Sequence, residues 1–394
     1  MRLVVIVNEK FSRQPDGTLF THGGGTYPTF ARYLAEFDRV RVFARVADST
    51  AHRGGTPGRA ASGPGVGFEA LPCFRGVRGW AQHYLTVRRI LQRAVRPDDA
   101  VVLRMPAWHL TDLAARQLVS RGQRFAVEVF GEPRGNFSPA FYRHPLAPLF
   151  RFWIPRRTRW VCRQAAAALY VAANPLEQLY PARAGALTVD CSDVDLPKAA
   201  FRDAPRQFTR APEVPRLVFV GSLQNLRKGP DTLLEAIALC GHTRDVHLTL
   251  IGAGKLRDRL EKLGHRLGIA RRLTWAGTLP NGAPVRDALD QAHLFLLPSH
   301  SEGLPRSLVE AMARALPCIA SPAGGIPGLL APEDLVPAGD AAGLASKILD
   351  AVRDPSRLSA MSHRNLETAR AFEASHLTRR RAPFLAEVRR LARC

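Results

Sequence analysis

The sequence lacks the features that mark several common protein classes. Its six cysteines are scattered, with no CxxC pair and no Cys/His cluster at zinc-binding spacing. This pattern argues against a disulfide scaffold and favours a reducing, cytoplasmic setting. No run approaches the roughly 18 apolar residues that a membrane span needs. The N-terminal MRLVVIVNEK has too short an apolar run for a signal peptide and no cleavage site.

Acidic residues are also scarce. The chain has 34 of them against 56 lysines and arginines, which gives a formal net charge of +22. Such an excess indicates an anionic partner: a nucleic acid, an anionic membrane surface or a phosphorylated substrate. A basic nucleic-acid-binding protein is the alternative that charge alone suggests. No helix-turn-helix, RRM-like or zinc signature supports it, so we expect no nucleic acid partner.

The 394 residues suffice for about two domains. Apolar runs alternate with helical patterns in both halves, and several of them are continuous, as in parallel strands buried on both faces. The predicted strands are 3–8, 39–46, 100–106, 125–131, 216–222, 246–254, 272–277, 294–299 and 318–321. The pattern predicts an α/β protein with two doubly wound domains.

Two loose segments, both rich in proline, divide this pattern. Residues 197–216 are also charged and have no period, so the boundary between the domains is expected there. We predict an N-terminal domain at 1–200, a linker at 201–215, a C-terminal domain at 216–370 and a terminal helix at 371–394 that returns toward the first domain. Residues 48–67 are predicted to form a mobile loop.

Glycine-rich turns follow several predicted strands. IGAGKLRDRL begins as G-x-G, but Arg257 replaces the third glycine of a dinucleotide fingerprint. Gly252 and Gly254 therefore indicate either a tight turn or a ligand contact. The triplet Gly23–Gly25 lies between the first strand and a helix, where glycines let the backbone approach an anion.

Two further stretches carry charges that suit a nucleotide sugar. In VFVGSLQNLRKGPDTLLEAI, Arg227 and Lys228 precede a helix that begins near Pro230, an arrangement suited to a diphosphate or to a plain surface charge pair. In SEGLPRSLVEAMARALP, Glu302 is placed in a loop and Glu310 in the following helix. Carboxylates accept hydrogen bonds, so sugar and ribose hydroxyls would explain both; otherwise they are ordinary exposed glutamates.

The E-x(7)-E pair around Gly-Leu-Pro, followed by EAMARALPCIASPAGGIP, resembles the donor site of the family 4 glycosyltransferases. The resemblance extends over VFVGSLQNLRKGPDTLLEA, LTLIGAG, LTWAGTLP and GDAAGLASKILDAVRDPSRLSAMSHRN, and more loosely over the first half. These are retaining enzymes with two facing Rossmann-like domains, the GT-B fold of the glycosyl transferases group 1. The likeness is to members that assemble polysaccharides.

The resemblance implies a role for each matching position. Lys228 would bind the donor diphosphate, Glu302 the transferred sugar near the reacting carbon, and Glu310 the ribose. Arg227 would replace an arginine that the family usually has where this chain has Ser222. The remaining predicted donor-binding positions are Gly24, Gly25, Gly221, Ser222, Gly277, Leu279, Gly303, Leu304 and Pro305.

The first half departs from the family where many members have a histidine. EVFGEPRGN offers Glu128, Glu132 and Arg134 instead, while His109 is expected to be a packing or helix-start residue. The implied reaction is transfer of a sugar from a nucleotide-diphosphate donor to an acceptor glycan or lipid-linked saccharide, with no metal or other cofactor. Another GT-B enzyme, an epimerase or a phosphorylase, is the alternative.

Residues 141–163 interleave aromatic side chains with six arginines, Arg143, Arg151, Arg156, Arg157, Arg159 and Arg163. This composition is typical of the interface of an anionic membrane, and equally of a partly buried helix with a solvated basic face. In the first interpretation the protein binds peripherally to the inner face of the plasma membrane.

Overall fold

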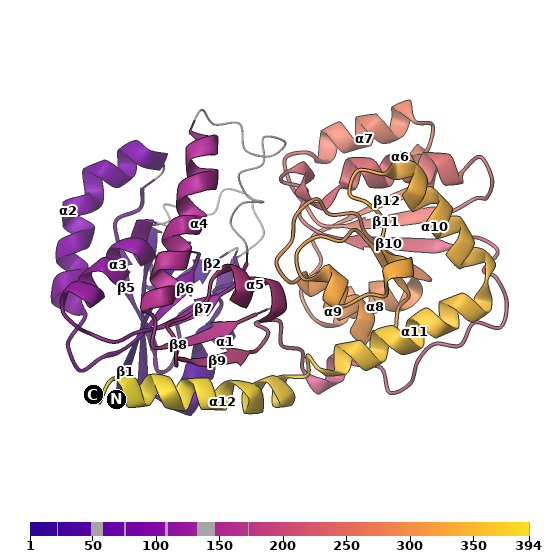
Figure 1. The fold of residues 1–394 in the computed structure, drawn as a ribbon. Coiled ribbons are helices and arrows are strands. Elements are labelled where there is room, and N and C mark those ends of the chain that lie inside the picture. The colour runs from indigo at the N-terminus through magenta and orange to yellow at the C-terminus, as the bar shows by residue number, and fades with distance from the viewer. Residues whose placement is uncertain are drawn as a thin grey trace. The chain divides into compact units, whose positions relative to one another are not determined.

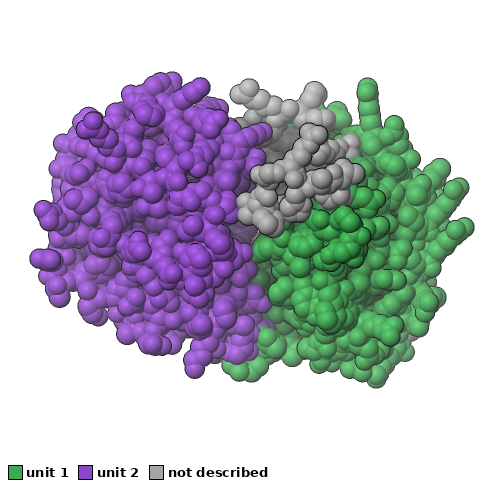
Figure 2. Space-filling view, turned by 180° about the vertical axis from the view of Figure 1, so that it is seen from behind, with its two compact units in different colours: residues 1–137, 144–193, 378–394 green, residues 138–143, 194–377 purple. Residues whose placement is uncertain are grey.

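The computed structural model describes residues 1–21, 23–48, 58–74, 76–106, 109–131, 146–171 and 173–393. The chain forms two compact units (Figures 1 and 2). Unit 1 comprises residues 1–137, 144–193 and 378–394, and unit 2 comprises residues 138–143 and 194–377. The domain bounds predicted from the sequence differ from the bounds of these units and stay a prediction. No helix in the described ranges combines the length and apolar character of a membrane-spanning segment.

Unit 1 contains a sheet of nine described strands, and its helices include the C-terminal one. The strands are β1 (Arg2–Arg13), β2 (Leu19–Thr21), β3 (Arg39–Asp48), β4 (Arg59–Ala60), β5 (Val66–Leu71), β6 (Ala100–Met105), β7 (Ala126–Val129), β8 (Ala167–Tyr170) and β9 (Leu187–Asp190). The helices are α1 (Tyr27–Ala31), the 3-10 turn η1 (Arg32–Ala35), α2 (Gly76–Ala94), α3 (His109–Ser120), α4 (Ala147–Gln164), α5 (Ala173–Leu179) and α12 (Ala374–Leu391).

Strand β1 lies inside the sheet of unit 1, with β3 and β5 on one side and β6, β7, β8 and β9 on the other. These strands are parallel, and Ile6 of β1 is opposite both Phe43 of β3 and Leu103 of β6. The apolar run Leu3–Ile6 has no exposed surface because both faces of the sheet are covered. Helices α2, α3 and α4 pack side by side on one face (Figure 1).

Unit 2 contains a parallel sheet of five described strands in the order β12-β11-β10-β13-β14. The strands are β10 (Arg216–Val220), β11 (His247–Ile251), β12 (Leu273–Gly277), β13 (Leu294–Leu297) and β14 (Cys318–Ala320). The helices are α6 (Pro230–Cys240), α7 (Arg257–Arg266), α8 (Ala283–Gln291), α9 (Arg306–Ala313), α10 (Ala341–Arg353) and α11 (Pro355–Arg370), with 3-10 turns η3 (Lys198–Ala200), η4 (Leu226–Lys228), η5 (Ala270–Arg272), η6 (Ile326–Gly328) and η7 (Pro332–Asp334). Helices α6, α7 and α10 cover one face, and α8, α9 and α11 the other (Figure 1).

The predicted α/β class is confirmed, and each of the nine predicted strands is present. The predicted loop at 48–67 is wrong at its C-terminal end. Arg59 and Ala60 pair with β2, and Gly67 belongs to β5, which pairs with β3 over six residues. The main-chain hydrogen bonds of this segment are thus made in the sheet. Residues 49–57 lie outside the described part of the chain.

The segment predicted as a linker, 201–215, is fixed to unit 2. The Arg202 main-chain N–H donates to the Ala313 carbonyl at 2.9 Å. The Arg206 guanidinium donates to four carbonyl groups, those of Leu289, Asp290, Ala292 and Arg314, at 2.7–3.4 Å. Residues 378–391 of helix α12 belong to unit 1, where Arg380 pairs with Asp190 and Arg389 pairs with Glu36.

Candidate functional site

Two loops of unit 2 start from neighbouring strands. The chain leaves β10, builds β11 and β12 outward on one side, and returns to place β13 on the other side of β10, with Leu217 opposite Leu294. The loops that follow β10 and β13 therefore begin at the point where the order of strands reverses. Ligands of doubly wound proteins bind at this point, outside the carboxyl ends of the strands.

Gly229 allows the two loops to touch. It ends η4 with φ 65°, and a Cβ there would lie 2.1 Å from the Pro298 carbonyl oxygen, so only glycine fits without displacement. Beside it, the His300 main-chain N–H donates to the Arg227 carbonyl at 2.8 Å. These contacts fix the main chain on both sides of Lys228 and immediately before Glu302.

Lys228 and Glu302 form an ion pair between the two loops. Lys228 Nζ donates to Glu302 Oε1 at 2.7 Å, and Ser299 Oγ donates to the same oxygen at 2.8 Å. The side chains are only 15% and 6% exposed, so the pair is largely removed from water. A Cβ at Gly221 would lie 2.5 Å from Lys228 Cδ, so a larger residue there would displace the Lys228 side chain. The structure brings together Gly221, Lys228 and Glu302.

Arg227 and Ser222 differ in the hydrogen bonds that their side chains make. The Arg227 side chain is half-buried and has no hydrogen-bond or ion-pair partner in the ranges that the structure describes. Its main-chain N–H donates to the Asn225 side chain at 3.1 Å. Ser222 is exposed, and its hydroxyl accepts from the Gln224 N–H at 3.3 Å, as a turn residue does. Next to Lys228, Arg227 is thus a cation whose guanidinium N–H groups make no hydrogen bond to the described residues.

Helix α9 begins after Pro305, as its sequence predicts, and buries Leu308 and Met312. Glu310 faces Arg306 one turn earlier, with Arg306 Nε donating to Glu310 Oε1 at 3.1 Å. Its side chain is 27% exposed, more than that of Glu302. Glu310 therefore belongs to a separate and more accessible pair on the same helix.

The turn after β14 supports the Glu302 loop and was not assigned from the sequence. Gly325 N–H donates to the Gly303 carbonyl at 2.8 Å. Gly324 has φ 58°, and a Cβ there would lie 2.2 Å from the Glu302 carbonyl oxygen. The run SPAGGIP carries this signal, because two glycines after a strand indicate close main-chain approach. Ser299 and His300 were missed as well, since only the fold brings them to their partners.

The other predicted donor positions of unit 2 lie at the same edge of the sheet or next to Glu302. Gly252 N–H donates to the Gly277 carbonyl at 2.7 Å, and a Cβ at Gly252 would lie 1.9 Å from the Gly221 carbonyl oxygen. Gly252 is thus required by a tight turn. Leu279 packs against the apolar core of unit 2, and Leu304 packs against it as well.

Gly24 and Gly25 belong to unit 1. The Gly25 N–H donates to Glu9 Oε2 at 2.9 Å, and the Gly24 carbonyl accepts from Thr29 Oγ1 at 2.8 Å. A Cβ at Gly25 would lie 2.7 Å from the same Glu9 oxygen, whereas nothing lies within 4 Å of a Cβ at Gly24. A Cβ at Gly25 would therefore displace the Glu9 carboxylate from its position in this structure.

The structure describes Glu128, but it does not describe Glu132 and Arg134, which were the other candidates at the position of the family's histidine. Glu128 is fully buried and accepts from Tyr33 Oη at 2.8 Å and from Arg32 at 3.4 Å. Burial disfavours its charged form, but Arg32 and Arg104 outweigh burial and lower the pKa of Glu128. An ionised carboxylate held in this way is a structural group. Glu132 and Arg134 lie outside the described residues.

His109 is confirmed as a packing residue at a helix start. It is the first residue of α3 and stacks on Trp80, with ring centroids 5.1 Å apart. Burial and then the nearby Arg45 lower the pKa of His109. Its imidazole is therefore neutral at physiological pH.

The basic segment is only partly available to an outside partner. Arg157 Nε donates to the buried Asp112 at 2.6 Å, and Arg159 Nε donates to the Leu179 carbonyl at 3.0 Å. The exposed arginines of α4 are Arg151, Arg156 and Arg163. An interpretation in which all six arginines face a membrane is therefore wrong for Arg157 and Arg159. Phe141, Tyr142 and Arg143 lie outside the described residues.

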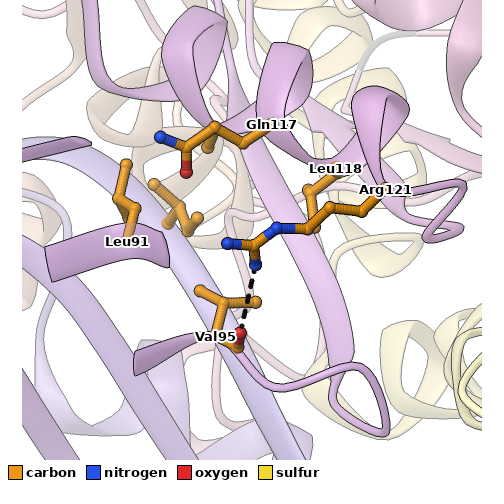
Figure 3. Close-up of a pocket in the computed structure, with 7 residues that line it drawn as sticks. Leu91, Val95, Gln117, Leu118 and Arg121 are labelled. Carbon is orange, nitrogen blue, oxygen red and sulfur yellow. Dashed lines mark hydrogen bonds between the residues drawn. The ribbon is translucent and has the colours of Figure 1, made fainter. Parts of the chain in front are cut away.

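A small pocket in unit 1 is unrelated to these groups (Figure 3). It lies among β1, α2 and α3 and is lined by Ile6, Leu91, Val95, Ala114, Gln117, Leu118 and Arg121. Its interior volume of about 10 Å³ suits about one water molecule, so it cannot hold a sugar. Within the described ranges, no three His, Cys, Asp or Glu side chains come together as a metal site.

Comparison with known proteins places the site within a family match. Residues 214–354, which include Lys228, Glu302 and Glu310, match the family described as Glycosyl transferases group 1. The lipopolysaccharide core biosynthesis glycosyltransferase LpsE of Rhizobium meliloti is 32% identical over 145 residues, 36% of this chain and 41% of LpsE. A D-inositol 3-phosphate glycosyltransferase of Mycolicibacterium gilvum is 34% identical over 165 residues, 39% of this chain and 36% of that protein.

The matched part thus spans about two fifths of these curated relatives. The likeness of fold is more extensive. The Anabaena protein HepE, solved in complex with UDP, superposes with a TM-score of 0.69 at 16% identity and covers 98% of this chain and 100% of its own. The chain therefore has the GT-B fold, and its residues 214–354 match the glycosyl transferases group 1 family.

Proposed function

We propose that the protein is a retaining glycosyltransferase of hexosyltransferase type, which transfers a sugar from a nucleotide-diphosphate donor to an acceptor hydroxyl in the assembly of a cell-surface polysaccharide or glycolipid. The observation that carries the proposal is the Lys228–Glu302 pair at the switch point of unit 2, inside the family match. The ammonium group of Lys228 can bind a phosphate, and the adjacent carboxylate of Glu302 can accept hydrogen bonds from sugar hydroxyls. The pair therefore suits a ligand in which a phosphate is attached to a sugar.

In this proposal the cations stabilise the leaving group. Negative charge develops on the diphosphate as the bond to the sugar breaks, and Lys228 and Arg227 lie directly before α6, whose N-terminus also favours an anion. A preorganised set of such donors lowers the barrier without a metal ion. Glu302 accepts hydroxyl protons of the transferred sugar, and Glu310 those of the ribose.

Donor binding then requires the hydrogen bond between Lys228 and Glu302 to break. The Lys228–Glu302 hydrogen bond of 2.7 Å must lengthen for Lys228 to face a diphosphate. The carboxylate freed by this movement keeps Ser299 as a donor and gains sugar hydroxyls. Within unit 2, the residues that would line the donor are Gly221, Ser222, Gly277, Leu279, Gly303, Leu304 and Pro305. The donor-binding role of Gly24 and Gly25 stays a prediction. UDP-sugars are the first donors to test, because HepE binds UDP.

The acceptor is proposed to be a glycan or lipid-linked saccharide at an anionic membrane surface, with the enzyme peripheral on its cytoplasmic side. Helices α2 and α4 contain no acidic residue. Their N-terminal ends lie at one edge of unit 1 (Figure 1). Helix α2 exposes the large apolar side chains of Val77, Tyr84 and Leu85, and the start of α4 exposes those of Leu146, Leu149 and Phe152. Both helices also have exposed arginines. Insertion of such side chains together with arginine contacts to lipid phosphates is typical of interfacial helices.

A screen of nucleotide sugars by thermal shift tests the donor, because a ligand of the folded state raises the melting temperature. The donor that stabilises the protein is then incubated with membrane extracts, and the product is detected by transfer of label. Release of nucleotide without any labelled product would favour an epimerase or phosphorylase instead.

A further inference from the structure

Unit 1 has its own switch point, and Arg104 and Glu9 lie on its two sides. The chain places β3 and β5 on one side of β1 and β6 on the other. Glu9 belongs to β1, and Arg104 is near the carboxyl end of β6. This is the position at which doubly wound units bind ligands, so side chains with unused hydrogen-bonding groups are informative there.

Arg104 is a buried cation with unused donors. Its side chain is 8% exposed, and its guanidinium stacks on the Phe130 ring, 4.0 Å from the centroid. Its nearest carboxylate oxygens are 3.4 Å away in Glu128 and 3.8 Å away in Glu9. Among the residues that the structure describes, none hydrogen-bonds to this guanidinium, and its buried Nε, 3.4 Å from Glu128 Oε2, makes an ion pair but no hydrogen bond. Buried arginines normally use several of their five N–H groups.

The neighbouring carboxylate is already shared. Glu128 accepts from Tyr33 and Arg32, and the ionisation of Glu128 is further favoured by Arg104 and Arg381. Arg381 is 3% exposed, and burial followed by repulsion from Arg32 lowers its pKa. Three guanidinium groups thus act on one fully buried carboxylate. The unused donors of Arg104 make this region receptive to a second anion.

Glu9 marks where such an anion fits. Its carboxylate is 34% exposed, faces Arg104 and accepts the Gly25 N–H at 2.9 Å. The Gly25 turn therefore already accommodates an anionic group, contributed here by the protein itself. An incoming phosphate or carboxylate finds the same two kinds of donor: a main-chain N–H and a guanidinium held flat by Phe130.

We propose that Arg104 binds an acidic group, phosphate or carboxylate, of the acceptor, so that the enzyme glycosylates anionic acceptors. This proposal rests on the proposed transferase function, which supplies the acceptor. The stacked guanidinium presents an edge suited to bidentate recognition of a planar or tetrahedral anion. Glu9 competes for that edge and weakens the binding of small anions by like-charge repulsion.

The test uses the full chain and three probes: inorganic phosphate, glucuronate and, as a neutral control, glucose. Binding is titrated by calorimetry with UDP absent and with UDP saturating. We expect phosphate and glucuronate to bind under both conditions and glucose to bind in neither. Arg104→Met keeps a long side chain that can still pack against Phe130. It is expected to weaken anion binding by roughly tenfold or more, because charge-assisted hydrogen bonds are lost.

Two variants separate this effect from misfolding. Arg104→Lys keeps the charge and should retain part of the affinity. Glu9→Gln keeps an acceptor for Gly25 N–H and should bind phosphate more tightly than wild type, a gain that damage to the fold cannot produce. Arg88→Met, on the exposed side of α2, is the matched control and should change nothing.

Three results would overturn the proposal. One is unchanged phosphate binding in Arg104→Met, and another is equal or weaker binding in Glu9→Gln. The third is a roughly tenfold loss of UDP affinity in Arg104→Met together with displacement of phosphate by UDP, which would assign Arg104 to the donor diphosphate. Failure to turn over any nucleotide sugar would contradict the transferase function alone, because the phosphate titration does not depend on turnover.

Discussion

Lys228 Nζ donates a hydrogen bond of 2.7 Å to Glu302 Oε1, although the two residues are 74 positions apart in the chain. Each is supplied by a loop that follows one of two adjacent parallel strands, and Gly229 lets those loops meet. The ion pair is largely buried, so each partner depends on the other when no ligand is bound. A ligand that binds here must replace both halves of the pair.

The first prediction concerns the stability of the unliganded protein. Lys228→Met leaves the buried Glu302 carboxylate without its cation, and we expect the free energy of unfolding of unit 2 to fall by about 3 kcal/mol. Lys347→Met removes a half-buried lysine that donates only to the Glu333 carbonyl, and should cost far less. Urea denaturation of both variants checks this. Equal losses would show that the Lys228–Glu302 pair contributes little.

Arg227 should behave in the opposite way. Its side chain has no partner in the described part of the chain, so Arg227→Ala should leave stability nearly unchanged. Transfer should nevertheless slow almost as much as in Lys228→Ala, because both cations serve one leaving group. The double variant should add little to either. Transfer at the wild-type rate in Arg227→Ala would leave Lys228 as the sole phosphate cation proposed here.

Gly229 offers a test of how tightly the two loops are held. Alanine there must adopt φ 65° and also displace the Pro298 carbonyl, which lies 2.1 Å from its Cβ. Gly268 has φ 71° with nothing within 4 Å of a Cβ, so Gly268→Ala carries only the conformational cost, about 1 kcal/mol. We expect Gly229→Ala to be clearly more destabilising in the same urea measurement and to weaken nucleotide binding. Similar losses would show that the loops yield easily.

The membrane prediction can now be confined to exposed arginines. Replacing Arg151, Arg156 and Arg163 with glutamate should release the protein from anionic liposomes at moderate salt, since each arginine near such a surface contributes about 1 kcal/mol. The matched control changes three exposed arginines of unit 2, Arg259, Arg271 and Arg353, in the same way. It should still float with the vesicles. Equal flotation of both variants, or none by wild type, would contradict membrane binding through α4.

Much of the fold could be predicted because buried parallel strands are continuous apolar runs. Two of the strands that escaped prediction, β8 and β5, contain residues that do not favour a strand by themselves. In β8, three of four positions are filled by Ala-Ala-Leu, and β5 contains Gly67 and Glu69. Their pairing with β7 and β3 overrides these weak local preferences.

Residues of the candidate site could be proposed from the sequence where a residue type is tied to its local sequence, as for Lys228 after Arg227 or Glu302 before Gly-Leu-Pro. Ser299 and Gly324 escaped because their roles depend on contacts that only the fold creates. The same holds for Arg157 and Arg159, whose charges pointed to a membrane but which bind Asp112 and the Leu179 carbonyl. Arginine composition alone does not distinguish an exposed cation from an internal one.

Glu302→Gln is the most direct test of the proposed donor site, with Glu310→Ala as its counterpart. Glutamine keeps the size of the side chain but accepts weaker hydrogen bonds from the sugar hydroxyls. Turnover should therefore fall by roughly 100-fold or more. UDP binding, measured by calorimetry, should persist. Glu310→Ala should instead weaken UDP binding, because it removes the proposed ribose contact. Small and equal effects of the two substitutions on turnover and on UDP affinity would contradict the assignment of Glu302 to the transferred sugar and of Glu310 to the ribose.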